Sequence, residues 1–562
     1  MSNREERLPG PDAPEPAEDG VPGTTTTRSS IGRASAFLAS GTLVSRLLGF
    51  LNAAVLTQAL GQIGVPADSF AIANQLPTTI YSLVAGGLLS AVIVPQIVKA
   101  GLHDDGGARF INRLVTLGLA IFLPLTVLAT LGAPVLTWIY TDADAPPELV
   151  AMTTAFAFWC LPQIFFYGVY SLVGETLNAR GVFGPFTWAP VLNNIVSISG
   201  IATFIAVFGG GQRPVEEWTP LMIAVVGGTA TLGIVTQAFG LLLFWRRAGL
   251  RYRPDFRWRG VGLGETGRAA GWVFGMFLVS MVGGIVEVRT AGEVSGDASV
   301  ATMQKGWLMF MLPHSVATVS IVTAYFTRMS THMRDGDRPA VRRDLTAALR
   351  NVLIIMVFSA FGLAVLAAPF SVFFSTNYAE TQALATVYIA YLSGLVSFTI
   401  FFVLLRVFYA LNDTRSAFLI QIAQTSFYVI ACLVVGAFVA PEWTAASLAL
   451  SLAVANTIQA VLSAVVLRKR LGGIGMREVL GQALWFVAAA VPAAAAGIGV
   501  LWMLGGVGEG SFPVSGPLQA AASMLITGAT MVIVYILVLA VTRNPELRSL
   551  AAPVTRRLRR RS

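Results

Sequence analysis

Arg46 is the residue of this chain whose surroundings point most directly to chemistry. It lies near the middle of the apolar run 34–60, which is long enough to cross a membrane and should exclude water. A charged side chain at that depth is costly, so it usually marks a substrate path or a paired charge. A guanidinium suits bidentate contact with phosphate or carboxylate groups. We therefore predict that Arg46 takes part in binding.

The same run also supports a structural interpretation of Arg46. Small residues recur at every fourth position, at Gly41, Ser45, Gly49 and Ala53. Such spacing is typical of a seam where two membrane helices pack closely. In that case Arg46 would pair with a carboxylate inside the helix bundle instead of binding a ligand.

The helices that must position Arg46 follow from the apolar runs of the chain. Hydrophobic residues make up 55% of the 562 residues and charged residues only 12%, which excludes an ordinary soluble domain. Each run can cross a hydrocarbon core of about 30 Å as a helix, and no ten-residue alternation favours a β-barrel. We therefore predict an all-α, polytopic membrane protein. The fourteen predicted spans are 34–60, 69–98, 113–138, 150–177, 187–209, 220–244, 269–291, 300–326, 348–373, 382–410, 416–440, 443–467, 480–505 and 517–542.

Basic residues fall in every second loop between the predicted spans. Lysine and arginine near span ends are retained in the cytoplasm, so this alternation orients the chain and predicts that both termini are cytoplasmic. The opposite loops are mainly acidic, with Arg213 as their one clear arginine. The net charge of +9 requires no nucleic acid, because a cytoplasmic face against anionic membrane lipids explains it.

A faint internal repeat predicts two six-helix lobes. The fourth span ends in Leu-Asn-Ala-Arg-Gly at 177–181, and the tenth, six spans later, ends in Leu-Asn-Asp-Thr-Arg at 411–415. Repeated lobes with a site at the membrane midplane are typical of transporters. The predicted organisation is a disordered cytoplasmic tail at 1–30, an N-terminal lobe at 31–245, a basic cytoplasmic linker at 246–268, a C-terminal lobe at 269–470, two additional spans at 471–545 and a basic cytoplasmic tail at 546–562.

Few residues have the spacing of a catalytic or metal centre. The segment 262–267 matches the pattern GxGxxG, but it lies in a basic loop without the strand that this motif needs. His314, after Pro313 in the eighth span, is open to two interpretations, a proton relay or a neutral hydrogen-bonded histidine at a kink. Cys160 and Cys432 lie alone within spans, and no cluster has metal-ligand spacing. We expect no cofactor, no metal site and no enzymatic activity.

Short motifs in successive spans give the chain a resemblance to a known family. They are Ser-Arg-Leu-Leu-Gly-Phe at 45–50, Ala-Asp-Ser-Phe-Ala-Ile-Ala at 67–73, Leu76-Pro77, Val94-Pro95, Leu-Val-Gly-Glu-Thr-Leu-Asn-Ala-Arg-Gly at 172–181, Ala189-Pro190, Asn194, and Arg-Val-Phe-Tyr-Ala-Leu-Asn-Asp-Thr-Arg at 406–415. In this order on fourteen spans, they resemble the MurJ (MviN) family of lipid II flippases, of the multidrug/oligosaccharidyl-lipid/polysaccharide exporter superfamily.

The resemblance implies two lobes around a cationic central cavity that opens alternately to the cytoplasm and to the exterior. It implies, as substrate and partner, an undecaprenyl-pyrophosphate-linked peptidoglycan precursor that is carried outward across the bacterial cytoplasmic membrane. Two negative charges leaving a cytoplasm held 100 mV negative gain up to about 4.6 kcal/mol, so the membrane potential can assist export. Cell-wall synthesis proteins are further candidate partners.

The resemblance makes four residues candidates for substrate binding. Arg46 shares a helix face with small residues, as a cavity wall requires. Asp68, at the outer start of the second span, matches an aspartate of the family; the alternative is an exposed charge favoured by the helix dipole. Arg289 and Lys305, together with Glu287, can line the exit of the cavity or extend to the membrane interface instead.

The chain departs from the family in the cavity itself. Charged positions of the family are occupied here by Asn52, by the uncharged segment 78–81, by Gly86, and by Leu308 and Met311. Because most of the cationic set is missing, two other functions stay open. One is export of another lipid-linked glycan, and the other is a non-transporting membrane scaffold for cell-wall synthesis proteins.

Overall fold

All regular structure in the described part of the chain is helical, which confirms the predicted all-α class. The computed structural model describes residues 28–84, 107–141, 145–180, 182, 184–257, 267–292, 300–544 and 546–547. Most of both predicted tails and the linker residues 258–266, which include most of the GxGxxG match, lie outside the described residues. The second half of the second predicted span, with Gly86 and Pro95, lies outside them too.

Twelve helices of the described chain are long and apolar enough to cross a membrane. A thirteenth span results when α15 (Tyr378–Leu392) and α16 (Leu395–Ala410), which meet at a bend of 40°, are counted together. The remaining predicted span begins as α2 (Val65–Val84), whose continuation lies outside the described residues. The helices are therefore consistent with fourteen spans.

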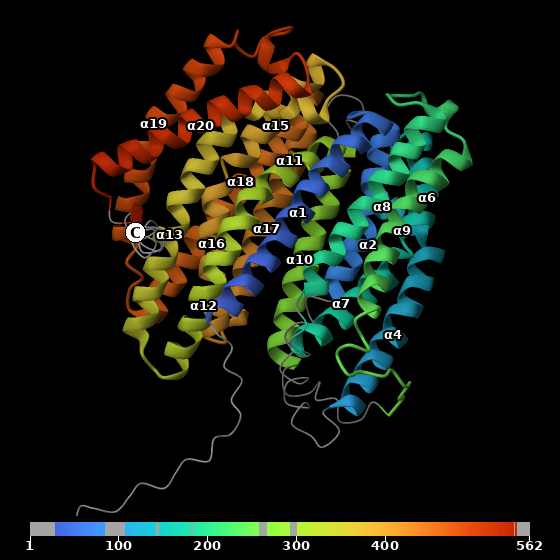
Figure 1. Cartoon of the computed structure of the whole chain (residues 1–562), viewed down its shortest axis with the longest axis horizontal. Coiled ribbons are helices and arrows are strands. Elements are labelled where there is room, and N and C mark those ends of the chain that lie inside the picture. Colours follow the sequence, from blue (N-terminus) through green and yellow to red (C-terminus); the bar gives the residue numbers. More distant parts are fainter. Residues whose placement is uncertain are drawn as a thin grey trace, which may run out of the picture.

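The helices that precede the basic linker pack against one another (Figure 1). They are α1 (Arg28–Leu60), α2, α4 (Ala108–Leu131), α5 (Ala133–Tyr140), α6 (Pro147–Cys160), α7 (Gln163–Ala179), α8 (Gly184–Phe208) and α9 (Pro220–Leu242). The most extensive contacts join α8 to α1 and α9, α2 to α6, and α4 to α7. Glycines permit the close approach: a Cβ added to Gly200 of α8 would lie 2.3 Å from Thr229 of α9.

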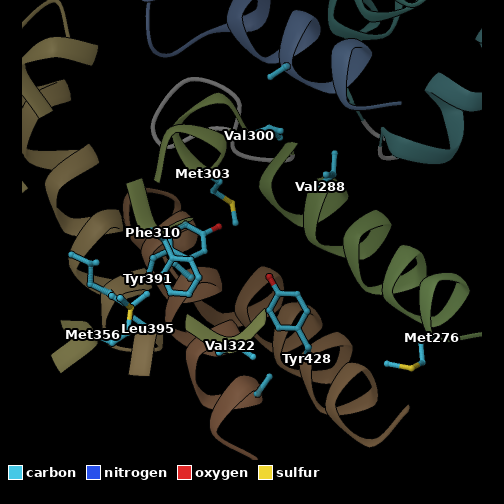
Figure 2. Packing of buried hydrophobic residues seen from close by; sticks show 14 of the residues in the cluster. Met276, Val288, Val300, Met303, Phe310, Val322, Met356, Tyr391, Leu395 and Tyr428 are labelled. Atoms are coloured by element: carbon cyan, nitrogen blue, oxygen red, sulfur yellow. The ribbon is translucent and has the colours of Figure 1, made fainter. Parts of the chain in front are cut away.

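The helices that follow the linker form a second group. They are α10 (Gly267–Gly292), α11 (Val300–Pro313), α12 (Val319–Arg334), α13 (Arg338–Val365), α14 (Ala367–Ser371), α15, α16, α17 (Thr414–Phe438) and α18 (Pro441–Leu471). Extensive contacts join α10 to α17, α12 to α13 and α16 to α18. Inside this group, the rings of Phe310 on α11 and Tyr391 on α15 pack with centroids 6.1 Å apart (Figure 2).

Two further helices lie at the edge of the second group, drawn in red in Figure 1. They are α19 (Met476–Met503) and α20 (Pro517–Val541), which pack on each other, while α19 also packs along α13. Tyr535 of α20 donates a hydrogen bond of 2.8 Å to the carbonyl oxygen of Ile354 on α13. We propose that α1 to α9 are the N-terminal lobe, α10 to α18 the C-terminal lobe, and α19 and α20 the two additional spans.

Candidate functional site: a cavity between the two lobes

One face of α2 is polar although the helix begins the second predicted membrane span. Its side chains follow one another at spacings of one, three, one and three residues, which places them along a single face of a helix. They are Asn74, Gln75, Thr78, Thr79 and Ser82, called here the α2 polar stripe. A polar face within the hydrocarbon region is tolerated where it lines a cavity or contacts other protein.

The α2 polar stripe borders a cavity of about 580 Å³ that lies between the two proposed lobes. The opposite wall comes from α10 and α11 of the C-terminal lobe, and aromatic side chains lie at several points of the lining. The other lining residues are Tyr140, Phe277, Ser280, Met281, Gly284, Glu287, Val288, Ala291, Val300, Met303, Gln304, Trp307, Tyr391 and Leu452. Glu287 is the charged residue among the described side chains that line it.

Glu287 projects from α10 toward two tyrosines of the C-terminal lobe. The hydroxyls of Tyr391 on α15 and Tyr428 on α17 lie near its carboxylate. Figure 2 shows both tyrosines in the same close-up as Val288 of α10 and Met303 of α11, with Tyr391 next to Phe310. The Tyr428 hydroxyl is buried and has no hydrogen bond of ordinary geometry within the described residues. The carboxylate therefore stands in a polar corner of the cavity, formed with these two tyrosine hydroxyls.

Asp68 joins the two lobes at the outer end of the cavity. It lies in the first turn of α2 with its side chain fully buried, so it is not an ordinary exposed charge. Its carboxylate accepts a hydrogen bond of 3.0 Å from the backbone N–H of Ala301, at the start of α11. A carboxylate at a helix N-terminus satisfies a free N–H and is favoured by the helix dipole.

A second contact between these helices lies one turn along. The side-chain amide of Gln304 on α11 donates to the backbone oxygen of Ala71 and to Oε1 of Gln75, both at 3.0 Å. Because Gln75 also belongs to the α2 polar stripe, this contact forms the boundary between the cavity and the region where the lobes meet.

Arg289 links the lobes through α10 and α5 instead of lining the cavity. Its Nε donates to the backbone oxygen of Ile139 at 2.8 Å, and its Nη2 donates to that of Trp138 at 2.9 Å. The guanidinium also lies 5.8 Å from the ring centroid of Trp138. These oxygens belong to the last turn of α5, where unpaired carbonyls and the helix dipole favour a cation.

Lys305 lies between two carboxylates near the same junction. Its Nζ is buried and makes no hydrogen bond in the described chain, while Asp68 and Glu380 are its electrostatic neighbours. Glu380 is itself held, because its Oε2 accepts from the backbone N–H and the hydroxyl of Thr376 at 2.7 and 2.8 Å. Lys305 therefore balances the negative charge of both lobes where they meet.

Together, these contacts lie at the end of the cavity that the charge pattern predicts to be external. We call the set the outer closure, and it consists of Asp68 with Ala301, Gln75 with Gln304, Arg289 with Trp138 and Ile139, and Lys305 between Asp68 and Glu380. Its hydrogen bonds join groups on different lobes, and Lys305 of the C-terminal lobe has one charged neighbour, Asp68, in the N-terminal lobe. Separation of the lobes at this end would break these hydrogen bonds and part Lys305 from Asp68, while Lys305 and Glu380 would stay in the same lobe.

Arg46 is exposed on α1 and does not line the cavity described above. It forms no ion pair with a carboxylate of the described residues. The small-residue seam is present in part: a Cβ on Gly41 would meet Trp188 of α8 at 2.7 Å, whereas a Cβ on Gly49 would meet nothing within 4 Å. One turn beyond Arg46, Phe50 contacts Phe370 of the C-terminal lobe with ring centroids 5.7 Å apart.

His314 is a packed core residue. It begins the π-helical turn His314–Thr318 that follows Pro313, and it is buried. Its Nδ1 lies 3.2 Å from the hydroxyl of Thr399, and its ring packs edge-on against Phe402 at 4.8 Å. This environment favours the interpretation as a hydrogen-bonded histidine at a kink.

The sequence analysis missed the α2 polar stripe and understated Glu287. The signal was available, since five polar residues at helical spacing within an apolar run are unusual in a lipid-facing helix. In the family comparison, the segment 78–81 stands out only by its lack of basic residues. Among the described residues, no three His, Cys, Asp or Glu side chains are grouped so that they could hold a metal ion.

Comparison with known proteins gives a consistent picture. Residues 56–513 match the model of the family described as lipid II flippase MurJ. A relative from Haemophilus influenzae, named probable lipid II flippase MurJ, is 26% identical over 404 residues, which are 67% of this chain and 75% of the relative. A Vibrio cholerae protein of the same name is 24% identical over 492 residues, or 82% and 87% of the two chains.

Solved structures share the fold. The structure described as lipid II flippase MurJ in an inward closed conformation superimposes with a TM-score of 0.69 at 17% identity, covering 90% of this chain and 98% of that one. An inward-facing multidrug resistance MATE transporter of the MOP superfamily superimposes with a TM-score of 0.58 at 16% identity, covering 76% and 94%. These matches extend over both proposed lobes.

Proposed function

This chain belongs to the lipid II flippase MurJ family, and on that premise we propose that it carries a lipid-linked peptidoglycan precursor from the inner to the outer leaflet of the bacterial cytoplasmic membrane. The observation that carries the proposal is the family match over residues 56–513, which includes the cavity and the outer closure. A polar cavity between two lobes is the kind of site in which an exporter holds a headgroup.

Alternating access follows from where the lobes touch. With the outer closure formed, the headgroup enters from the cytoplasmic side and reaches the α2 polar stripe. Rocking of the lobes then replaces the outer closure by contacts at the opposite end, and the headgroup leaves outward. A few hydrogen bonds and ion contacts, each contributing roughly 1 to 3 kcal/mol, allow both states to be populated.

The four predicted binding residues divide into two roles. Arg46 is exposed on a helix that contacts both lobes, and we assign it to the pyrophosphate, because a free guanidinium binds phosphate oxygens in pairs. Asp68, Arg289 and Lys305 belong to the outer closure. We assign them to control of the exit and not to a lasting contact with substrate.

Transport is proposed to need no enzymatic step and no cofactor. The membrane potential favours outward movement of the anionic pyrophosphate by about 2.3 kcal/mol per charge and 100 mV. Basic residues at the ends of α12 and α18 favour anionic lipids of the inner leaflet, in keeping with the predicted orientation.

Two other functions lead to different outcomes in one experiment. The chain is reconstituted in vesicles that contain fluorescent lipid II, and the precursor that reaches the opposite leaflet is measured by its accessibility to a membrane-impermeant quencher. An exporter of another lipid-linked glycan would move that glycan and leave lipid II in place. A scaffold for cell-wall synthesis proteins would move neither, and would instead retain such proteins on affinity capture.

A further inference from the structure

We propose that Glu287 and the aromatic side chains around it form a binding site for a primary ammonium group carried by the translocated headgroup. The proposal rests on the proposed function, because it assigns one end of the headgroup to one corner of the cavity. It concerns the chemistry of recognition, which a lipid II flippase assignment leaves open.

The first argument is charge. Glu287 lines the cavity, and no basic side chain of the described chain forms an ion pair with it. Arg289, two residues along α10, is directed to the carbonyls of α5. Lys305, on the facing helix, has Asp68 and Glu380 as its charged neighbours. Glu287 is half-buried in the cavity wall. A carboxylate partly withdrawn from water without a cation is disfavoured, so a cationic ligand would restore the balance.

The second argument is the chemistry of the surrounding side chains. The rings of Tyr140, Phe277, Trp307 and Tyr391 line the same cavity as Glu287. Aromatic faces attract ammonium groups, and aromatic cages use this attraction to bind ammonium ligands. The nearby hydroxyls of Tyr391 and Tyr428 can accept the remaining N–H groups, since an ammonium has three donors and no acceptor.

The third argument is position. Glu287 lies five residues before the end of α10 at Gly292, beside the outer closure, whereas Arg46 lies on α1 outside the cavity lining. The volume of about 580 Å³ is typical of a ligand pocket and can hold part of a headgroup. The uncharged α2 polar stripe supplies amide and hydroxyl groups along the cavity wall that also includes Glu287. The headgroup would thus enter with its ammonium end foremost and its pyrophosphate behind.

A bare cation is the competing occupant of the same carboxylate. Among the described residues, Glu287 has two phenol hydroxyls and one thiol, Cys432, as polar neighbours, and no second carboxylate. Hard cations such as sodium or calcium are normally held by more oxygen ligands than this. The ammonium proposal therefore fits the aromatic lining better, and sodium or proton binding becomes an outcome that the experiment must separate.

The test compares two probes on the full-length protein in nanodiscs. One is lipid II whose peptide carries a lysine, and the other is the same lipid with that lysine Nε-acetylated, which removes the charge but keeps the length. We expect acetylation to weaken binding to the unchanged protein by roughly 10- to 100-fold, the range for a lost charge-assisted hydrogen bond. In Glu287→Gln, which preserves shape, both probes should bind alike and weakly. The matched control is Glu442→Gln, an exposed acid at the start of α18, which should discriminate like the unchanged protein.

Each result has a defined meaning. Equal binding of both probes to the unchanged protein would overturn the ammonium site while leaving the flippase proposal intact. Binding of neither probe would count against the proposed function itself. If Glu287→Gln removed a dependence on sodium or pH but kept discrimination between the probes, the site would hold an inorganic cation or proton, and the ammonium assignment would be wrong.

Discussion

Asp68 on α2 accepts a hydrogen bond of 3.0 Å from the backbone N–H of Ala301 on α11, although the two residues are 233 positions apart in the chain. This bond joins the N-terminal turns of two helices that belong to different lobes. It is buried, and Lys305 adds a positive charge beside it. This bond makes Asp68 part of the outer closure. The apolar runs of the sequence do not distinguish such a buried aspartate from an exposed charge at a helix terminus.

The first prediction concerns that bond. Asp68→Ala should shift the protein toward states in which the outer ends of the lobes are apart, because a buried bond to a charged acceptor contributes about 1.5–3 kcal/mol. Spin labels at the exposed positions Glu216 and Glu509 should report a longer mean distance by pulsed electron resonance. An unchanged distance distribution in Asp68→Ala would show that the bond does not hold the closure.

Arg289 offers a second test, with a graded series. Arg289→Lys keeps the positive charge but loses the forked donation to two carbonyls, and Arg289→Ala loses both. Closure, measured with the same label pair, should weaken in the order Arg, Lys, Ala. Arg213 is a suitable control, since it donates to the carbonyl of Phe208 within its own lobe, and Arg213→Ala should leave the distance unchanged.

A third prediction uses the contact between Gln75 and Gln304, whose side chains are joined at 3.0 Å. Cysteines at both positions, in a background with Cys160 and Cys432 replaced by alanine, should be joined by a short thiol cross-linker. Cross-linked protein should lose transport, and a reductant that cleaves the linker should restore it. Full transport by the cross-linked protein would contradict a mechanism in which these helices separate.

The fourth prediction concerns the segment that leads into the basic linker. Arg257 donates to Asp255 from its side chain and backbone, Arg113 donates at 3.0 Å, and the backbone N–H of Asp255 bonds Thr116 of α4. These bonds, those from Arg257 foremost, hold the pKa of Asp255 well below its usual range. A depressed pKa stabilises the fold above the unfolded-state pKa, and that contribution is lost only as pH falls through the lower, folded-state pKa.

The segment 250–257 should therefore stay attached to α4 to the same extent from pH 8 down to pH 5. Hydrogen exchange, corrected for the intrinsic rate, should show steady protection of residues 250–257 over that interval. In Asp255→Asn, the amides of residues 250–257 should exchange faster at every pH. Asp335 is an exposed acid in the turn after α12, and Asp335→Asn should leave the exchange of these amides unchanged. A loss of protection near pH 6 in the unchanged protein would contradict the assignment.

The helical class and the family were predictable from the sequence because both depend on local information. An apolar run specifies a membrane span, and short motifs such as that at 172–181 can be recognised in the sequence itself. The rotation of each span about its axis was not predictable in the same way. A span that is apolar on most sides gives little indication of which face meets another lobe, so the contact of Arg289 with the end of α5 could not be predicted from the sequence.

The outer closure was unpredictable for a second reason. Its partners are far apart in the chain, as with Asp68 and Ala301, and several of them are backbone atoms that carry no sequence signal. The α2 polar stripe is the opposite case, because its spacing was visible and only its meaning was missed. Arg46 stays a prediction: the structure places it on an exposed face of α1, outside the cavity.

Translocation of lipid II by Arg46→Ala in reconstituted vesicles tests the central claim most directly, with the unchanged protein and Arg213→Ala measured alongside. The account predicts that the unchanged protein and Arg213→Ala move lipid II to the opposite leaflet, faster when the potential favours exit of negative charge. Arg46→Ala should be slower by on the order of tenfold or more, the effect of losing one charge-assisted contact. No movement of lipid II by the unchanged protein would contradict the function, and full activity of Arg46→Ala would contradict the role assigned to that residue.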